Sequence, residues 1–225
     1  MSHSECYING IWYPSVTTIL AAKPKPWLDA WKEKWGLLAF RKTKMASAIG
    51  DEFHRCIESW INTSAYTIKA PTIDGFAMPS TITRVEGMVK SWIAWAMMVD
   101  GTIDHTELQV VSRTHAYSGS LDAVGTFESK PVLYDWKTSA KIYDDYHLQL
   151  AAYAQAYNEQ TGGRVKDGLI VCVSKDKPHF KVTTKHFKLG KRPLKEFLKL
   201  REMFDDIQAK GESDAKVNDS EASGC

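Results

Sequence analysis

Two carboxylates and one ammonium group are predicted to meet on a β-hairpin. Asp122 lies in one strand-like segment, and Asp135 and Lys137 lie in the next. If a four-residue turn over 128–131 joins two symmetric strands, Asp122 lies opposite Lys137. Because side chains alternate between faces with period two, all three then project from one face. Such a face could hold a cation and act on a phosphate group.

This cluster has two interpretations. Charges on the solvent face of a hairpin often form cross-strand ion pairs, each worth about 0.2–1 kcal/mol. However, Asp135 and Lys137 follow the apolar residues 132–134 and share a face with Leu133. Since Mg²⁺ takes oxygen ligands and is commonly held by one or two carboxylates, a half-buried face with two acids favours a metal site.

A sheet and several helices must position these residues. Alternating β-branched and aromatic residues predict a three-strand meander over 107–112, 117–127 and 132–137, and further strands are expected over 168–174 and 180–187. Apolar residues at helical spacing predict helices over 45–61, 82–99, 144–159 and 193–208. The sequence therefore predicts an α/β fold.

The hairpin residues and the order of these elements carry a family resemblance. Asp122, followed by Asp135-Trp-Lys137, resembles the acid, acid-x-lysine signature of the PD-(D/E)xK nuclease superfamily. Residues 14–18 are similar to the start of phage and prophage exonucleases of its RecB-like branch. Other motifs that resemble this branch are Gly50 to His54, Glu107, and Gln149 with Tyr153. The resemblance covers about residues 13–175 and implies a restriction-endonuclease-like core, a central mixed sheet with the meander, flanked by helices.

The resemblance also implies a metal centre. Asp122 and Asp135 would ligate the metal, with the carbonyl of Trp136 as a third oxygen. His54 resembles the additional ligand of the RecB-like branch, and an imidazole shifts the preference toward Mn²⁺ relative to an all-oxygen site. Lys137 would hold or polarise the attacking water and offset charge at the scissile phosphate. The expected cofactor is therefore Mg²⁺ or Mn²⁺.

Three further residues are expected near this centre. Glu107 could orient a metal-bound water. Gln149 and Tyr153 are four residues apart, so they lie on one helical face and could reach the hairpin or the nucleic-acid backbone. Two alternatives stay open: His54 as a surface histidine on its helix, and Tyr153 as a core tyrosine with a satisfied hydroxyl.

Two regions outside these motifs could also contact nucleic acid. Residues 175–201 hold eight lysines and two arginines against two acids, which suits either a path for a polyanion or a solvated basic face. Trp27, Trp31 and Trp35 recur at helical spacing beside several lysines. This stripe either packs in the core or offers a stacking surface for unpaired bases.

Length and composition limit the other classes of protein. The 225 residues are 44% hydrophobic and 25% charged, with a formal net charge of +2, close to globular averages. The cysteines form no C-x-x-C pair, which excludes a zinc ribbon and favours reduced thiols. The four-cysteine clasp of some relatives is absent, so no iron–sulfur cluster is expected. No apolar run is long enough to cross a membrane, and no signal-peptide pattern opens the chain, so a cytoplasmic location in a bacterium or phage-infected host is expected.

The expected organisation is a RecB-like nuclease domain over 1–210. It would comprise an N-terminal helical part at about 13–100 and a catalytic core at about 104–187. Residues 211–225 hold four acids, one lysine and few apolar residues, which predicts a disordered acidic tail.

The resemblance implies a metal-dependent DNA exonuclease that hydrolyses phosphodiester bonds from DNA ends in phage or bacterial DNA processing, recombination or repair. The expected substrate is single-stranded or duplex DNA ends, and a recombination or single-strand-annealing protein is a candidate partner. Two alternatives stay open: a structure-specific or nicking endonuclease of the same superfamily, and a non-catalytic module that binds DNA ends.

Overall fold

A computed structural model describes residues 6–175 and 180–222, with side chains up to residue 210. Its centre is a five-stranded sheet that consists of β5 (Gly101–Ser112), β6 (Tyr117–Phe127), β7 (Lys130–Lys137), β8 (Asp167–Val173) and β9 (Val182–Lys188), in that order. The first three strands form an antiparallel meander, β8 runs parallel to β7, and β9 is antiparallel to β8. The predicted mixed sheet with its meander is confirmed.

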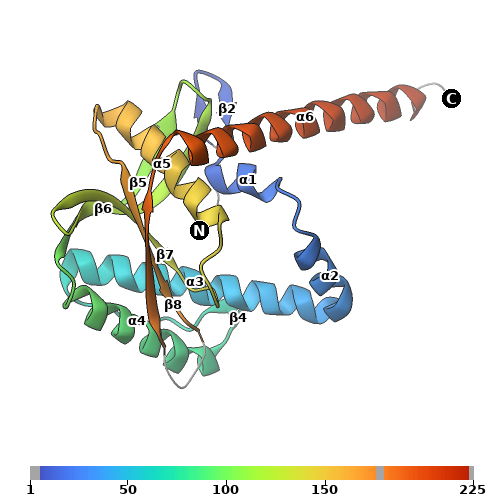
Figure 1. Cartoon of the computed structure of the whole chain (residues 1–225). Helices are drawn as coiled ribbons and strands as arrows, with labels where there is room; N and C mark the ends of the chain where they lie inside the picture. The colour runs from blue at the N-terminus through green and yellow to red at the C-terminus, as the bar shows by residue number, and fades with distance from the viewer. Residues whose placement is uncertain (1–5, 176–179, 223–225) are drawn as a thin grey trace.

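Helices cover both faces of this sheet (Figure 1). One layer consists of α3 (Leu37–Thr63) and α4 (Ile82–Ala96), and the other consists of α1 (Val16–Ala21), α5 (Asp145–Thr161) and α6 (Lys191–Ala222). Each layer buries its own cluster of apolar side chains against the sheet. Because parallel strands need a crossover connection, α5 lies between β7 and β8 in the chain.

Smaller elements complete the N-terminal half of the chain. They are β1 (Cys6–Ile8), β2 (Ile11–Tyr13), α2 (Pro26–Trp35), β3 (Thr72–Ile73), β4 (Phe76–Ala77) and the 3-10 turn η1 (Pro79–Thr81). Ser15 caps α1, since its Oγ accepts the backbone N–H of Thr18 at 3.1 Å. The helical part expected over 13–100 therefore also contains short strands.

The β6–β7 turn differs from the predicted one. Phe127 pairs with Lys130, so the turn has two central residues, Glu128 and Ser129, both with positive φ (48° and 61°). The four-residue turn, and with it the position of Asp122 opposite Lys137, was wrong. A two-residue turn with positive φ at both positions has the backbone twist that matches the twist of the flanking antiparallel strands. The four-residue turn assumed from the sequence does not need these two positive φ values. The register moves by an even number of residues, so the predicted common face is kept.

The ends of two helices also differ from the prediction. α3 begins at Leu37 rather than Met45. The sequence pattern missed the first turns because residues 37–44 are largely exposed and show no core-facing periodicity. α6 continues to Ala222, through most of the segment for which disorder is expected. This segment has no proline to end the helix, and its alanines, glutamates and single lysine are compatible with helix. Residues 223–225 lie outside the described part, and the domain boundary at 210 stays a prediction.

The tryptophan stripe lies on α2, which buries none of its residues. Trp27 is 58% exposed and Trp35 is 38% exposed, so the core-packing alternative is wrong for these two side chains. No helix in the described ranges combines the length and apolar character needed to cross a membrane.

Candidate metal centre and active site

A cavity of about 670 Å³ opens where the meander meets α3 and α5. It is lined by six of the eight predicted site residues: His54, Glu107, Asp122, Lys137, Gln149 and Tyr153. These residues come from three strands and two helices that lie far apart in the sequence. The fold therefore brings together the motifs that the sequence places over about a hundred residues.

Three of these side chains could hold a metal ion together. One ligand atom each from His54, Glu107 and Asp122 lies within 4.8 Å of the other two, and His54 Nδ1 is 3.5 Å from Asp122 Oδ1. Glu107, expected only to orient a water, is thus placed as a candidate ligand. Asp135 is not part of this close group.

The position of His54 follows from the packing of α3. Ile49, Phe53 and Ile57 are fully buried on the face that packs against the sheet and α4. One turn before the histidine, Gly50 approaches the residue after β7 so closely that a Cβ would lie 3.3 Å from Thr138 Oγ1. The small residue lets α3 bring His54 to the end of the meander.

The backbone of Glu107 adopts an uncommon conformation. Its φ is +50°, which costs a residue other than glycine or asparagine about 1–3 kcal/mol. Thr106 pairs with Ala123 and Leu108 with Leu121, so Glu107 lies opposite Asp122. Ser120 donates a hydrogen bond to its carboxylate at 3.3 Å. Burial and then the Asp122 charge raise the pKa of Glu107 to about 7.

Asp122 is held in its charged form. Burial raises its pKa, but His54, Lys137 and the Trp136 N–H outweigh this effect, and the pKa of Asp122 lies below its ordinary value. The backbone N–H of Trp136 donates to Asp122 Oδ2 at 2.6 Å. The carboxylate therefore also joins β6 to the C-terminal end of β7.

Asp135 and Lys137 form a buried ion pair beside this group. The Lys137 ammonium lies 2.8 Å from both carboxylate oxygens of Asp135, which is only 1% exposed. Burial raises the pKa of Asp135 to about 6, although Lys137 opposes this effect. For Lys137, burial lowers the pKa, but the charges of Asp135 and Asp122 outweigh it and raise the pKa. Lys137 is therefore a permanent cation at neutral pH.

The donor set fits a divalent metal ion. Within the described ranges, three buried side-chain atoms lack a hydrogen-bond partner: Trp92 Nε1, His54 Nδ1 and Asp135 Oδ2. The last two have ionic contacts, His54 Nδ1 with Asp122 Oδ1 at 3.5 Å and Asp135 Oδ2 with Lys137 at 2.8 Å. Such atoms are rare because burying them unpaired is costly. One imidazole with two or three carboxylates is a ligand set that Mg²⁺ and Mn²⁺ accept. The histidine thus lies among the acids, which disfavours its alternative as a surface residue.

Gln149 and Tyr153 share one face of α5, as predicted. The Gln149 amide donates to the Tyr153 hydroxyl at 3.2 Å. Gly119 on β6 makes room for the ring, since a Cβ there would lie 2.6 Å from Tyr153 Cε1. Both side chains line the cavity but are almost fully buried, so Tyr153 combines the predicted placement with features of the core alternative.

Trp136 contributes differently from the expectation. Its indole packs edge-on against Trp92 in the α3–α4 core, with ring centroids 5.1 Å apart, and its N–H binds Asp122. The proposed role of its carbonyl as a metal ligand stays a prediction.

Ser120 and Glu58 are among the cavity residues that the sequence analysis missed. Ser120 lies two residues before Asp122 and so shares its side of the strand, and Glu58 lies one helical turn after His54. Spacings of two in a strand and four in a helix were the available signals.

A mixed sheet with acids and a lysine at one end of its meander is typical of the PD-(D/E)xK fold. A family model described as the PD-(D/E)XK nuclease superfamily matches residues 36–225, and the chain belongs to that superfamily. The fold and the family predicted from the motifs are confirmed.

Individual relatives include exonucleases. The chain is 29% identical over 188 residues to human mitochondrial genome maintenance exonuclease 1, which covers 74% of this chain and 52% of that protein. The fold of this chain is similar to that of an alkaline exonuclease from Laribacter hongkongensis in complex with dAMP (TM-score 0.44, 11% identity, 77% of this chain and 85% of that one). It is also similar to a phage-related exonuclease from Haemophilus somnus 129PT (TM-score 0.42, 11% identity, 88% and 96%). The chain spans about half the length of the human relative.

Proposed function

We propose that this protein is a metal-dependent DNA exonuclease of the RecB-like branch, which hydrolyses phosphodiester bonds from DNA ends with Mg²⁺ or Mn²⁺. The observation that carries the proposal is the set of candidate ligands on His54, Glu107 and Asp122, within 4.8 Å of one another beside the Asp135–Lys137 pair. Superfamily membership supports nucleic-acid hydrolysis, and the name of the human relative supports exonuclease action.

The acids and the imidazole would hold the metal ion. His54, Glu107 and Asp122 form the close group, and Asp135 would complete it from the neighbouring strand. A divalent ion in such a site supplies Lewis-acid stabilisation of the phosphate charge and makes water a better nucleophile at neutral pH. His54 Nδ1 supports this role, since it is buried without a hydrogen-bond partner and faces Asp122 Oδ1 at 3.5 Å.

Lys137 would act as a fixed charge rather than as a base. Because its pKa is raised by Asp135 and Asp122, it keeps its protons at neutral pH. An ammonium held in place by Asp135 can orient the attacking water and stabilise the negative charge that develops on the phosphate. In hydrolysis the water loses a proton and its oxygen forms the new bond to phosphorus, while the bond from phosphorus to the departing sugar oxygen breaks and that oxygen takes up a proton. Both protons exchange with solvent water.

Glu107 would orient the attacking water through the metal ion. Its carboxylate lies in the close group with His54 and Asp122, and Ser120 donates a hydrogen bond to it at 3.3 Å. Because burial and then the Asp122 charge raise the pKa of Glu107 to about 7 in the metal-free protein, this carboxyl must lose its proton before it can hold the metal.

Cleavage of end-labelled DNA tests the proposal. Single-stranded and duplex linear DNA, each with free and blocked termini, and closed circular DNA are incubated with Mg²⁺, Mn²⁺ or EDTA. We expect metal-dependent release of nucleotides from free ends and no cleavage of circles. Cutting of circular DNA would identify an endonuclease instead, and metal-dependent binding without cleavage would identify a non-catalytic module.

The cellular setting follows the sequence resemblance. Phage or bacterial DNA recombination or repair in the host cytoplasm, together with a recombination or single-strand-annealing protein, is the setting that we propose for this activity. Co-purification of such a protein from the native host tests the proposed partner. An active nuclease that purifies from the native extract without any other protein would contradict it.

A further inference from the structure

A second cavity, of about 340 Å³, adjoins the proposed active site. The two cavities share Thr17 of α1 and Gln149 of α5 as lining residues. The second cavity continues from this shared wall to α2, to the loop before α5 and to the first turn of α5, where Trp27, Tyr143 and Tyr146 respectively line it. A strand bound at the active site therefore has an adjoining cavity into which its next nucleotide can extend.

Aromatic rings connect this second cavity with the catalytic lysine. Trp27 is stacked on Tyr143, with ring centroids 5.9 Å apart and planes within 3°. Tyr143 meets the edge of Tyr146 at 5.7 Å, and Lys137 Nζ lies 4.9 Å from the Tyr146 ring centroid. The rings thus form a continuous path from α2 to the proposed site of phosphate hydrolysis.

The outer end of this path is open. Trp27 is 58% exposed and no residue of α2 is buried, so the core does not account for this tryptophan. An exposed indole that is already stacked on a second ring offers a fixed flat surface. Every base has a π-face that can extend such a stack, whatever its sequence.

The charges around the cavity are compatible with a DNA backbone. Lys23 and Lys25 both pair with Asp145, at 2.6 and 3.1 Å, which leaves one net positive charge. Lys141 Nζ lies 5.2 Å from the Tyr143 ring centroid. Cations next to stacked aromatic rings are the combination found in sites for single-stranded nucleic acid.

From these observations we propose that an unpaired nucleobase of the DNA strand bound at the active site stacks on the Trp27–Tyr143 pair. The inference rests on the proposed function for the identity of the substrate. It assigns to α2 the task of holding a separated strand, and it makes single-stranded DNA the form that enters the site.

Binding measurements with abasic oligonucleotides test this base site. Affinity for single-stranded DNA is measured in Ca²⁺, chosen to limit turnover, for the parent protein and for Trp27→Ala, Trp27→Phe and Phe76→Ala. A series of oligonucleotides carries one abasic position at each place near the 5′ or 3′ end. Phe76 is the matched control, since it is a 75% exposed aromatic residue that lines neither cavity.

Trp27→Ala should weaken binding by about ten-fold, which is about 1.4 kcal/mol, while Trp27→Phe should retain most of the affinity and Phe76→Ala all of it. One abasic position should weaken binding to the parent protein but not to Trp27→Ala. Equal abasic penalties in both proteins, or parent-like affinity of Trp27→Ala, would overturn the base site. An effect of similar size on blunt duplex DNA would place general DNA contact there instead.

A separate readout distinguishes this inference from the proposed function. Hydrolysis of the p-nitrophenyl ester of thymidine 5′-phosphate, which has no neighbouring nucleotide to reach the second cavity, reports on the metal centre alone and should be the same for the parent and Phe76→Ala. If the parent protein cleaves no DNA but the abasic coupling is present, the nuclease proposal fails and the base site remains. If DNA is cleaved without any coupling, only the base site fails.

Discussion

The backbone N–H of Trp136 donates to the carboxylate of Asp122 at 2.6 Å, across the β6–β7 pair. Ala123 and Tyr134 are the last residues that pair before this point, so the side chain continues the ladder where the backbone pairing ends. Asp122 thus holds together the strand ends that carry the proposed metal site. Its substitution should affect both stability and metal binding.

Two substitutions at Asp122 separate these roles. Asp122→Asn keeps an oxygen that accepts the Trp136 N–H but removes the charge, so we expect loss of DNA cleavage and metal binding with little change in the free energy of unfolding. Asp122→Ala should in addition lose about 1–3 kcal/mol, because the Trp136 N–H is left without its partner. Denaturant unfolding and metal titration measure the two effects. Cleavage near the parent level by either variant would contradict the site assignment.

Lys137 is expected to support folding as well as catalysis. Lys137→Met would leave the buried Asp135 carboxylate without its cation, and breaking a buried ion pair from one side typically costs about 3–5 kcal/mol. The double variant Lys137→Met, Asp135→Asn should recover most of that stability but no cleavage. Urea unfolding of the three proteins in EDTA provides the measurement. A double variant as unstable as Lys137→Met alone would show that the pair is not the cause.

Metal binding should stabilise the protein more as the pH rises. Burial and then Asp122 raise the pKa of Glu107 to about 7 from 4.5, burial raises that of Asp135 to about 6 from 3.8, and the pKa of His54 is raised because Asp122 outweighs the opposing effect of burial. The metal-free folded protein therefore binds more protons than the unfolded chain between about pH 4 and 7, and its stability falls across that window as the pH rises. Metal ligands must lose these protons, so binding strengthens in the same direction.

Melting temperatures in EDTA and in Mn²⁺, measured from about pH 5.5 to 8, test this linkage. We expect the Tm in EDTA to fall with pH and the gain from Mn²⁺ to increase. Glu107→Gln serves as the control, since it should reduce the slope in EDTA. A gain from Mn²⁺ that is the same at every pH would contradict the assignment of these groups as ligands.

The meander and α5 could be predicted because their patterns are strong. β6 has the bounds that its alternation predicts, and the apolar face of α5 and the glycines after it give its ends to within two residues. Asp122 and Asp135 could be placed on one face from parity alone, which the two-residue turn preserves. The sequence thus locates the centre of the site without the correct register.

Other features depend on tertiary structure that no local pattern records. The positive φ of Glu107 departs from regular strand geometry, and strand alternation does not predict it, so its carboxylate could not be assigned to the metal group. The first turns of α3 have exposed apolar residues such as Leu37 and Phe40, and periodicity fails where no core face exists. The stacking of Trp27 on Tyr143 joins segments more than a hundred residues apart.

Removal of residues 211–225 should have little effect. The segment has few apolar residues to bury, and its residues 211–222 form the far end of α6, which extends away from the sheet in Figure 1. We expect Tm within a few degrees of the parent and unchanged DNA cleavage for the chain truncated after residue 210. A large loss of either would show that this segment docks on the nuclease fold or on its substrate.

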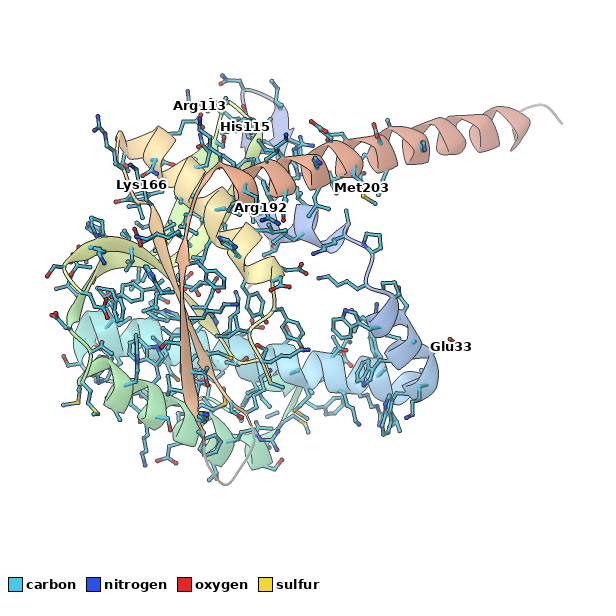
Figure 2. The ribbon with its side chains drawn as sticks, viewed as in Figure 1. Glu33, Arg113, His115, Lys166, Arg192 and Met203 are labelled. Carbon is cyan, nitrogen blue, oxygen red and sulfur yellow. The ribbon has the colours of Figure 1, made fainter. Side chains whose placement is uncertain are left out.

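The basic segment 175–201 should contribute to DNA binding through its cations that lack acidic partners. Lys188 pairs with Asp167 at 2.6 Å and Arg192, labelled on the first turn of α6 in Figure 2, pairs with Glu196 at 3.1 Å. Among the described residues, neither Lys181 nor Lys185 forms an ion pair with an acid. Both line a cavity of about 510 Å³ together with Lys141 and the hydroxyls of Ser139, Ser174, Thr183 and Thr184. A site of lysines and hydroxyls is suited to a phosphate group.

Two double variants with the same loss of charge test this contribution. Lys181→Gln, Lys185→Gln removes the two lysines of the cavity, whereas Lys188→Gln, Arg192→Gln removes two cations that already have acidic partners. Each lost phosphate contact should flatten the slope of log affinity against log salt by about 0.7 for single strands. We therefore expect a slope smaller by about 1.4 for the first variant and a nearly unchanged slope for the second, measured in Ca²⁺. Equal slopes in both variants would show that the segment is a solvated basic face, because its individual positions would then make no distinct contact with the DNA.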